Sequence, residues 1–118
     1  MGAIVSASCA CGFKCESEVG GSRANFLSVC HFPCLCRTCN DVVQVNLLAA
    51  SRACPKCCGK DIAAYDEPRL SASKGHYVTM WRKPKPNDEQ FWELHSGDYF
   101  CPKCSKMTLH FENIGHFS

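Results

Sequence analysis

The hydrophobic pattern of this chain consists of short segments in which apolar and polar residues alternate, without a long stretch of helical period. Val42 to Leu47 alternates with β-branched side chains, and Met107 to Phe111 alternates in the same way. A period of two places successive side chains on opposite faces of a strand. Leu47 to Ala50 could instead close a short helix. The pattern predicts a β-rich fold with little helix.

Turn residues group these segments into predicted hairpins. Ile4 to Ser8 and Phe13 to Val19 flank a Cys-Ala-Cys-Gly turn near the start of the chain. His76 to Arg82 and Phe91 to Ser96 flank a turn that contains two prolines, a residue type that favours chain reversal. The polar stretch of residues 60–75 between these hairpins is predicted to be a loop.

The length of 118 residues is sufficient for one small domain with a modest core. We expect residues 1–118 to form a single compact domain, with a first unit over residues 1–50 and a second unit over residues 51–118. The second unit contains an inserted hairpin over residues 76–96. Chains this short gain little stability from burial alone, so additional cross-links are expected.

Twelve cysteines, about a tenth of the chain, supply candidates for such cross-links. Eight of them form close C-x-C or C-x-x-C pairs, which are Cys9/Cys11, Cys36/Cys39, Cys54/Cys57 and Cys101/Cys104. Cysteines two or three positions apart rarely form a disulfide with each other, but they chelate one metal ion readily. The spacing therefore predicts two four-cysteine sites in a small metal-stabilised β-rich protein, with zinc as the expected ion in each.

The cysteine pairs, each called a knuckle below, are predicted to combine in the order in which they occur. Cys54-Pro55-Lys56-Cys57 and Cys101-Pro102-Lys103-Cys104 share the sequence C-P-K-C, which favours placing both in one site. The other site then contains Cys9, Cys11, Cys36 and Cys39. The spacing also permits a crossed arrangement, in which the first knuckle joins the third and the second joins the fourth.

Residues beside the knuckles carry two further expectations. Gly12 and Gly59 follow knuckles and are expected to adopt the positive φ that such turns often need. Four cysteines are left outside the predicted sites, namely Cys15, Cys30, Cys34 and Cys58. We interpret them as small, partly buried apolar residues. Two alternatives remain open: Cys34 could replace Cys36 or Cys39, and Cys15 could replace a cysteine of the first knuckle.

The C-P-x-C turns, the C-x-C-G turn and the β-rich pattern resemble the zinc-ribbon and rubredoxin-like class of metal-binding proteins. The resemblance covers the ligand turns rather than the whole chain, and the order of the motifs is similar to that of small uncharacterised bacterial zinc-ribbon proteins. Members of the broad class bind nucleic acid, dock on partner proteins or carry iron for electron transfer. The resemblance therefore implies the ligand roles of the knuckle cysteines but no particular reaction.

Neither the first residues of the chain nor its net charge indicates a membrane or nucleic-acid partner. The chain begins without a basic leader or a long apolar run, so we expect a cytoplasmic protein with no membrane partner. The formal net charge is +2, and two zinc ions with eight thiolates would change it to about −2. We therefore expect a non-enzymatic structural-zinc protein that binds a macromolecule, with protein favoured over nucleic acid.

Two groups of residues nevertheless combine features that suit nucleic acid. The predicted hairpin sets aromatic residues beside basic ones, a composition that supports base stacking; these residues are Trp81, Arg82, Lys83, Lys85 and Trp92. Lysines also lie within and just after the C-P-K-C knuckles, at Lys56, Lys60, Lys103 and Lys106. The favoured interpretation is structural in both cases, because the aromatic residues suit a core and the lysines offset thiolate charge.

Two other classes of protein remain as alternatives. One is a rubredoxin-like electron carrier with iron in one four-cysteine site. The other is a zinc-dependent or thiol-dependent enzyme, which would require a site with three cysteines and an open position for water. The sequence contains neither an H-E-x-x-H motif nor a glycine-rich phosphate loop, so catalysis has no support from a motif.

Overall fold

The computed structural model describes residues 2–21, 28–49, 52–72, 75–83 and 89–117. In these residues the chain forms nine strands and one short 3-10 helix. The strands are β1 (Gly2–Cys9), β2 (Lys14–Gly20), β3 (His31–Cys36), β4 (Asp41–Asn46), β5 (Ile62–Ala64), β6 (Tyr77–Arg82), β7 (Phe91–His95), β8 (Tyr99–Phe100) and β9 (Met107–Phe117). The 3-10 helix η1 spans Pro68–Leu70. The prediction of a β-rich fold with little helix is confirmed.

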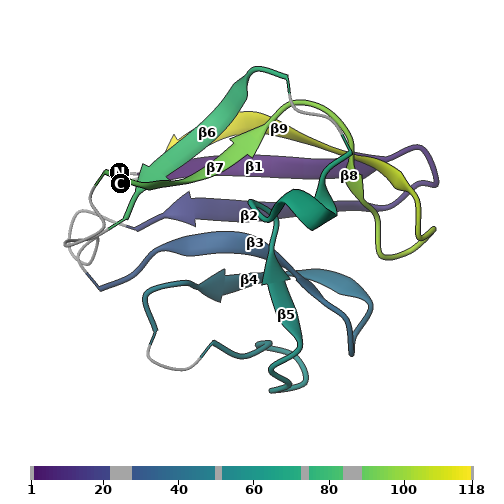
Figure 1. Cartoon of the computed structure of the whole chain (residues 1–118), viewed down its shortest axis with the longest axis horizontal. Helices are drawn as coiled ribbons and strands as arrows, with labels where there is room; N and C mark the ends of the chain where they lie inside the picture. The colour runs from purple at the N-terminus through teal and green to yellow at the C-terminus, as the bar shows by residue number, and fades with distance from the viewer. Residues whose placement is uncertain (1, 22–27, 50–51, 73–74, 84–88, 118) are drawn as a thin grey trace.

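Seven strands form one antiparallel sheet in the order β4-β3-β2-β1-β9-β8, and β5 also pairs with β3. β1 lies in the middle, where it pairs with β2 on one side and with β9 on the other (Figure 1). Gly2 lies opposite Phe117, so the two ends of the described chain are adjacent. Strands from residues 1–50 and from residues 51–118 therefore share one sheet.

The remaining two strands, β6 and β7, form a separate hairpin above the sheet (Figure 1). The hairpin contacts the sheet at Gly20, where an added Cβ atom would lie 2.5 Å from the ring of Trp81. Gly20 also has a φ of 103°, a conformation that side chains disfavour. Glycine is required here both by the backbone angle and by the indole ring.

The core between the layers is built around aromatic side chains and the apolar face of β1. Tyr65, Tyr99 and Phe111 pack edge to face with centroid separations of 5.1–6.0 Å. Ala3, Val5 and Ala7 alternate inward along β1, as a strand with one buried face requires. The face of β1 that carries these three residues thus lies over the core.

Some elements differ from those expected from the sequence. Residues 60–75 were predicted as a loop but contain both β5 and η1. β3 is buried at every position from Phe32 to Cys36, so the side chains on both of its faces are covered. A strand buried on both faces shows no alternation of apolar and polar residues, so the sequence pattern did not predict β3. β5 is only three residues long and relies on pairing with β3.

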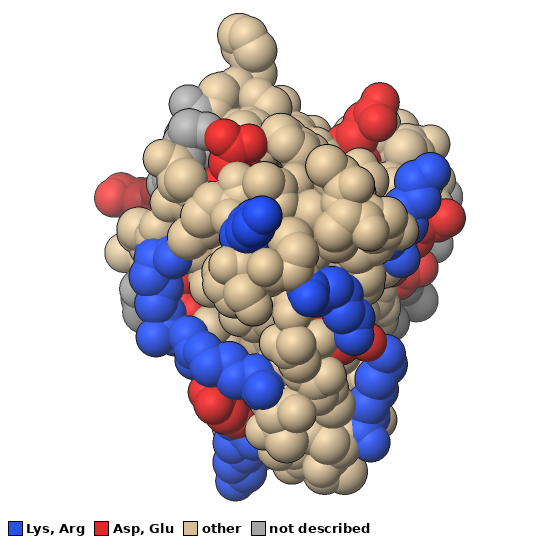
Figure 2. Space-filling view, turned by 90° about the vertical axis from the view of Figure 1, so that its right-hand side faces the viewer, with Lys and Arg blue, Asp and Glu red and all other residues tan. Residues whose placement is uncertain are grey.

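The surface carries charges of both signs. The β1–β2 turn and the β8–β9 loop lie at the right of Figure 1, and Figure 2 views the molecule from that side. Lys and Arg side chains spread over this face and Asp and Glu side chains lie among them (Figure 2).

Within the described residues, no helix is long and apolar enough to cross a membrane.

Candidate metal centres

The eight cysteines of the four knuckles lie together in two groups of four. The outer cluster contains Cys9, Cys11, Cys101 and Cys104, and the inner cluster contains Cys36, Cys39, Cys54 and Cys57. The predicted combination of knuckles was wrong, and the crossed alternative was wrong as well. The first knuckle joins the fourth and the second joins the third, which is a nested arrangement.

Strand pairing explains why the knuckles combine in this way. β1 pairs with β9, and the register places Cys9 opposite Leu109, close to the last knuckle. β3 pairs with β5, and the register places Cys36 opposite Ile62, close to the third knuckle. The clusters therefore form where paired strands bring two turns to the same end of the sheet.

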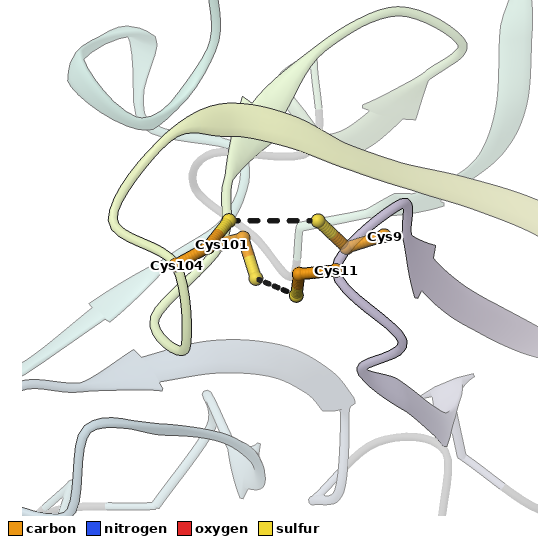
Figure 3. Close-up of side chains that lie close together, drawn as sticks. All are labelled: Cys9, Cys11, Cys101 and Cys104. Carbon is orange, nitrogen blue, oxygen red and sulfur yellow. Dashed lines mark hydrogen bonds between the residues drawn. The ribbon is translucent and has the colours of Figure 1, made fainter.

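In the outer cluster the knuckle from the β1–β2 turn faces the knuckle from the β8–β9 loop (Figure 3). The Sγ atoms of Cys9 and Cys104 are 3.6 Å apart, and those of Cys11 and Cys101 are 3.8 Å apart. Four sulfurs at a zinc–sulfur distance of about 2.3 Å in a tetrahedron would be about 3.8 Å from one another. A disulfide would bring two sulfurs to about 2.05 Å. The separations suit metal coordination.

The inner cluster has the same geometry. The Sγ atoms of Cys36 and Cys57 are 3.7 Å apart, as are those of Cys39 and Cys54. In each cluster all four Sγ atoms lie within 4.8 Å of one another. Both clusters therefore place four sulfurs close to the spacing of ligands around a single tetrahedral ion, and the protein has two candidate metal centres.

Each knuckle is followed immediately by a residue with positive φ. The four residues are Gly12 at 100°, Asn40 at 55°, Cys58 at 59° and Ser105 at 59°. In three knuckles this residue donates its backbone N–H to the first cysteine's carbonyl, at 3.0 Å for Gly12 to Cys9, 2.9 Å for Cys58 to Cys54 and 2.8 Å for Ser105 to Cys101. The expectation for Gly12 is confirmed. The expectation for Gly59 was wrong, because Cys58 takes the positive φ.

Gly59 has a different role at the inner cluster. Its backbone N–H donates to the Sγ of Cys57 at 3.4 Å. A Cβ atom at this position would lie 3.1 Å from that sulfur, closer than ordinary van der Waals contact. Glycine therefore lets the backbone approach the sulfur closely enough to donate a hydrogen bond.

Backbone N–H groups also point at other sulfurs of the inner cluster. Cys39 donates to the Sγ of Cys36, and Lys56 donates to the Sγ of Cys54, each at 3.3 Å. Burial raises the pKa of the Cys54 thiol, but the N–H groups of Cys57 and Lys56 outweigh it and lower the pKa to about 7. Hydrogen bonds to a charged form favour that form, so the turn stabilises the thiolate that binds a metal.

Thr108 contributes to the outer cluster, and no motif in the sequence pointed to it. Its hydroxyl lies 3.0 Å from the Sγ of Cys9 and 3.5 Å from the Sγ of Cys104. The backbone N–H of Cys11 and this hydroxyl lower the pKa of the Cys9 thiol to about 6. The same hydroxyl is the main cause of a lowered pKa at Cys104. Thr108 is thus a partner of two sulfurs without being a ligand.

Two ion pairs cross the inner cluster from one knuckle to the other. Arg37 Nη1 lies 3.0 Å from Asp61 Oδ1, and the Arg37 backbone N–H donates to the Asp61 carbonyl at 3.0 Å. Lys56 pairs with Asp41, which follows the other knuckle. Burial raises the pKa of Asp41, but the Lys56 contact outweighs it and lowers the pKa. These pairs link the two turns across the inner cluster.

The flanking lysines do not surround one site, because the nested arrangement separates them. Lys56 and Lys60 flank the third knuckle, in the inner cluster, whereas Lys103 and Lys106 flank the fourth, in the outer cluster. Lys103 Nζ also lies 6.0 Å from the centroid of the Phe13 ring, across the outer cluster. Each cluster thus has its own nearby ammonium groups.

The four remaining cysteines belong to neither cluster. Cys30 and Cys34 are buried, and burial raises the pKa of each thiol to about 12. Burial likewise raises the pKa of Cys15 to about 11. Cys58 is exposed. The proposed replacement of a cluster cysteine by Cys34 or Cys15 is therefore not what the structure shows.

The two tryptophans of the β6–β7 hairpin lie mainly against the protein. Trp92 is 6% exposed and Lys83 Nζ lies 5.5 Å from its ring centroid, while Trp81 packs against Gly20. Lys85 and the side chain of Arg82 lie outside the described residues. Contact between this hairpin and nucleic acid stays a prediction.

Comparisons with protein-family models, curated proteins and solved structures find no match to this chain. The class of the protein therefore rests on its own geometry. It is a small β-rich protein with two four-cysteine clusters that could each hold a metal ion.

Proposed function

We propose that the protein binds two structural zinc ions, one in each cluster, and acts as a non-enzymatic module that binds a macromolecule. The observation that carries the proposal is the tetrahedral spacing of four sulfurs in both clusters. Four thiolates fill every position of a tetrahedral zinc ion, which leaves none for water or substrate. Closed sites of this kind are structural rather than catalytic.

The positions of the clusters support a structural role. The outer cluster ties the end of β1 to the loop between β8 and β9, and the inner cluster ties the β3–β4 turn to the segment before β5. Structural zinc contributes about 10–16 kcal/mol in small finger peptides, comparable to the roughly 5–15 kcal/mol of a whole domain. The ions would supply much of the stability of this small fold.

A protein partner is favoured over nucleic acid by charge and by exposed apolar side chains. Zinc loading gives a net charge of about −2, and Lys and Arg share the metal-bearing face with Asp and Glu (Figure 2). Tyr77 and Ile114 are large apolar residues that are 58% and 51% exposed. A surface that is apolar in places and balanced in charge is better suited to bind a protein than to bind the phosphate backbone of a nucleic acid.

The metal proposal is tested by elemental analysis of the native protein combined with a count of reactive thiols. We expect two zinc ions per chain, a colourless preparation and protection of ten of the twelve thiols, because eight would bind zinc and Cys30 and Cys34 are buried. Iron with a visible colour that bleaches reversibly on reduction would favour the electron carrier instead. A reactive thiol among the eight cluster cysteines with two ions bound would indicate an open site and contradict the proposal.

The partner class is tested separately by electrophoretic mobility shift with single-stranded DNA and RNA. We expect no shift at physiological salt with micromolar protein. A complex that forms at this salt and weakens steeply as salt increases would contradict the preference for a protein partner, because phosphate contacts depend on counterion release.

A further inference from the structure

A pocket of about 290 Å³ lies beside both metal clusters and is not explained by structural metal binding. It is called the inter-cluster pocket below, and its lining residues are Leu35, Arg37, Asn40, Arg69, Leu70 and Phe100. Its volume is near the lower limit of small-molecule sites, which are mostly about 300–1,000 Å³. The pocket therefore suits a small group rather than a nucleotide or a folded surface.

The cluster knuckles hold two walls of the pocket in place. Arg37 follows Cys36 of the inner cluster directly, and Phe100 precedes Cys101 of the outer cluster directly. The Phe100 carbonyl also accepts a hydrogen bond of 2.8 Å from the Tyr65 hydroxyl. A loaded protein would present these walls in one arrangement, because metal coordination fixes the adjacent backbone.

The pocket combines an apolar base with cationic groups. Leu35 and Leu70 are 3% and 4% exposed, and Phe100 is half-buried beside them. Arg37 and Arg69 supply two guanidinium groups, and no acidic residue is among the described residues that line the pocket. A site of this composition selects a ligand that carries a negative charge on an apolar body.

Both arginines also make ion pairs with carboxylates that do not line the pocket. Asp61 contacts Nη1 of Arg37 at 3.0 Å, and Glu67 contacts Nη2 of Arg69 at 3.2 Å. Neither carboxylate lines the pocket. A guanidinium has five N–H donors in a planar fork, so one contact at a terminal nitrogen leaves others for a ligand.

The charge of the neighbouring clusters decides between carboxylate and phosphate. A zinc ion with four thiolates carries about −2, and two such centres lie beside the pocket. Their repulsion acts more strongly on a phosphate dianion than on a carboxylate monoanion. A planar carboxylate also matches the guanidinium fork.

We propose that the inter-cluster pocket binds a carboxylate attached to a small apolar group. Two sources offer this chemistry: a free aliphatic acid, or the C-terminal residue of a peptide with an apolar side chain. Both would place the carboxylate on Arg37 and Arg69 and the apolar group on Leu35, Leu70 and Phe100. This site goes beyond the proposed function, because it does not depend on which macromolecule the protein binds.

The proposal is tested by NMR titration of the zinc-loaded, ¹⁵N-labelled protein with four probes. They are N-acetyl-leucine, its neutral amide N-acetyl-leucinamide, 4-methylpentanoate and inorganic phosphate. We expect at least one carboxylate probe to cause saturable shifts at the backbone amides of Arg37, Asn40 and Leu70. N-acetyl-leucinamide should bind at least tenfold more weakly than N-acetyl-leucine. Inorganic phosphate should also bind more weakly than the carboxylate. The carboxylate that binds more tightly identifies the source.

Variants separate pocket binding from a general effect of charge. Arg69→Gln should weaken carboxylate binding at least tenfold, and Arg69→Lys should weaken it less. Lys14→Gln removes an exposed charge outside the pocket and should leave binding unchanged. Equal binding of acid and amide, tighter binding of phosphate, or unchanged binding in Arg69→Gln would overturn the proposal. Zinc content measured on the same samples shows separately whether the metal proposal fails.

Discussion

At the residue scale, the sulfurs of both clusters depend on neighbours that are not cysteines. Gly59 donates its N–H to Cys57, and Thr108 places its hydroxyl against Cys9 and Cys104. Neighbours that hydrogen-bond to metal ligands fix their orientation and tune their charge. The metal affinity of each cluster should therefore respond to changes outside the ligand set.

Thr108→Val removes the hydroxyl and keeps the shape of the side chain. We expect it to weaken zinc binding at the outer cluster by about 10-fold to 100-fold, the range seen when such partners are removed. Competition against a chromogenic chelator measures this change. Thr79→Val on β6 is the control and should leave the affinity unchanged; identical competition curves for Thr108→Val and the control would disprove the role of Thr108.

Asp66 provides a prediction about pH. Burial raises the pKa of this carboxyl, so the folded protein binds its proton more tightly than the unfolded chain does. Above the pKa of the folded state, the buried charge therefore lowers the free energy of unfolding. This loss disappears as the pH falls below the pKa of the unfolded chain, about 3.9. Asp66→Asn should unfold at a higher temperature than the natural protein at pH 7.

The advantage of Asp66→Asn should be constant from pH 6 to 8 and should shrink toward acid pH. Thermal unfolding of both proteins at each pH gives the difference directly and cancels effects of acid on the metal centres. A variant that is less stable at pH 7, or an advantage that grows toward acid pH, would rule out burial as the main influence on this carboxyl.

At the element scale, strand pairing decides which knuckles meet. The alternation at Val42–Leu47 and Met107–Phe111 was sufficient to predict β4 and the start of β9. It contained no information on the partners of these strands, and the pairing of β1 with β9 is what gives the clusters their nested order. The shared C-P-K-C sequence was misleading, because local turn chemistry is the same whichever knuckle lies opposite.

Nesting makes the two clusters differ in the length of chain that they close. Cys36 and Cys57 are 21 positions apart, whereas Cys9 and Cys104 are 95 positions apart. The entropy of loop closure favours the shorter loop by about 1.3 kcal/mol, or roughly tenfold in affinity. Zinc added below one equivalent to the unfolded, reduced chain should therefore load the inner cluster first.

Differential alkylation with mass spectrometry measures this order of loading. Protection should appear first at Cys36, Cys39, Cys54 and Cys57 and later at the outer cysteines. Simultaneous protection of both sets, or earlier protection of the outer set, would show that loop closure does not govern the order.

The contact between the β6–β7 hairpin and the sheet depends on Gly20. Gly20→Ala should lower the free energy of unfolding by about 3 kcal/mol, because it combines a strained φ with a clash against Trp81. Gly12→Ala is a matched control, since Gly12 has a similar φ of 100° but no atom within 4 Å of an added Cβ. It should cost only about 1–2 kcal/mol. Equal losses, measured by denaturant titration, would argue against the close approach of Trp81.

At the scale of the whole molecule, the proposed metal ions in the two clusters would act together with a modest core to hold the strands in place. The cysteine spacing predicted two four-cysteine sites, and the structure gathers those eight cysteines into two groups. The positions of Thr108 and of the inter-cluster pocket could not be predicted, because they depend on contacts between distant parts of the chain. Tertiary pairing, rather than local sequence, creates both.

The most direct measurement is zinc-edge X-ray absorption of the native protein with its zinc content determined on the same sample. Two closed four-cysteine centres predict two zinc ions per chain and four sulfur neighbours per ion at about 2.3 Å, with no oxygen or nitrogen in the first coordination sphere. One ion per chain, or an average that includes nitrogen or oxygen ligands, would contradict the account.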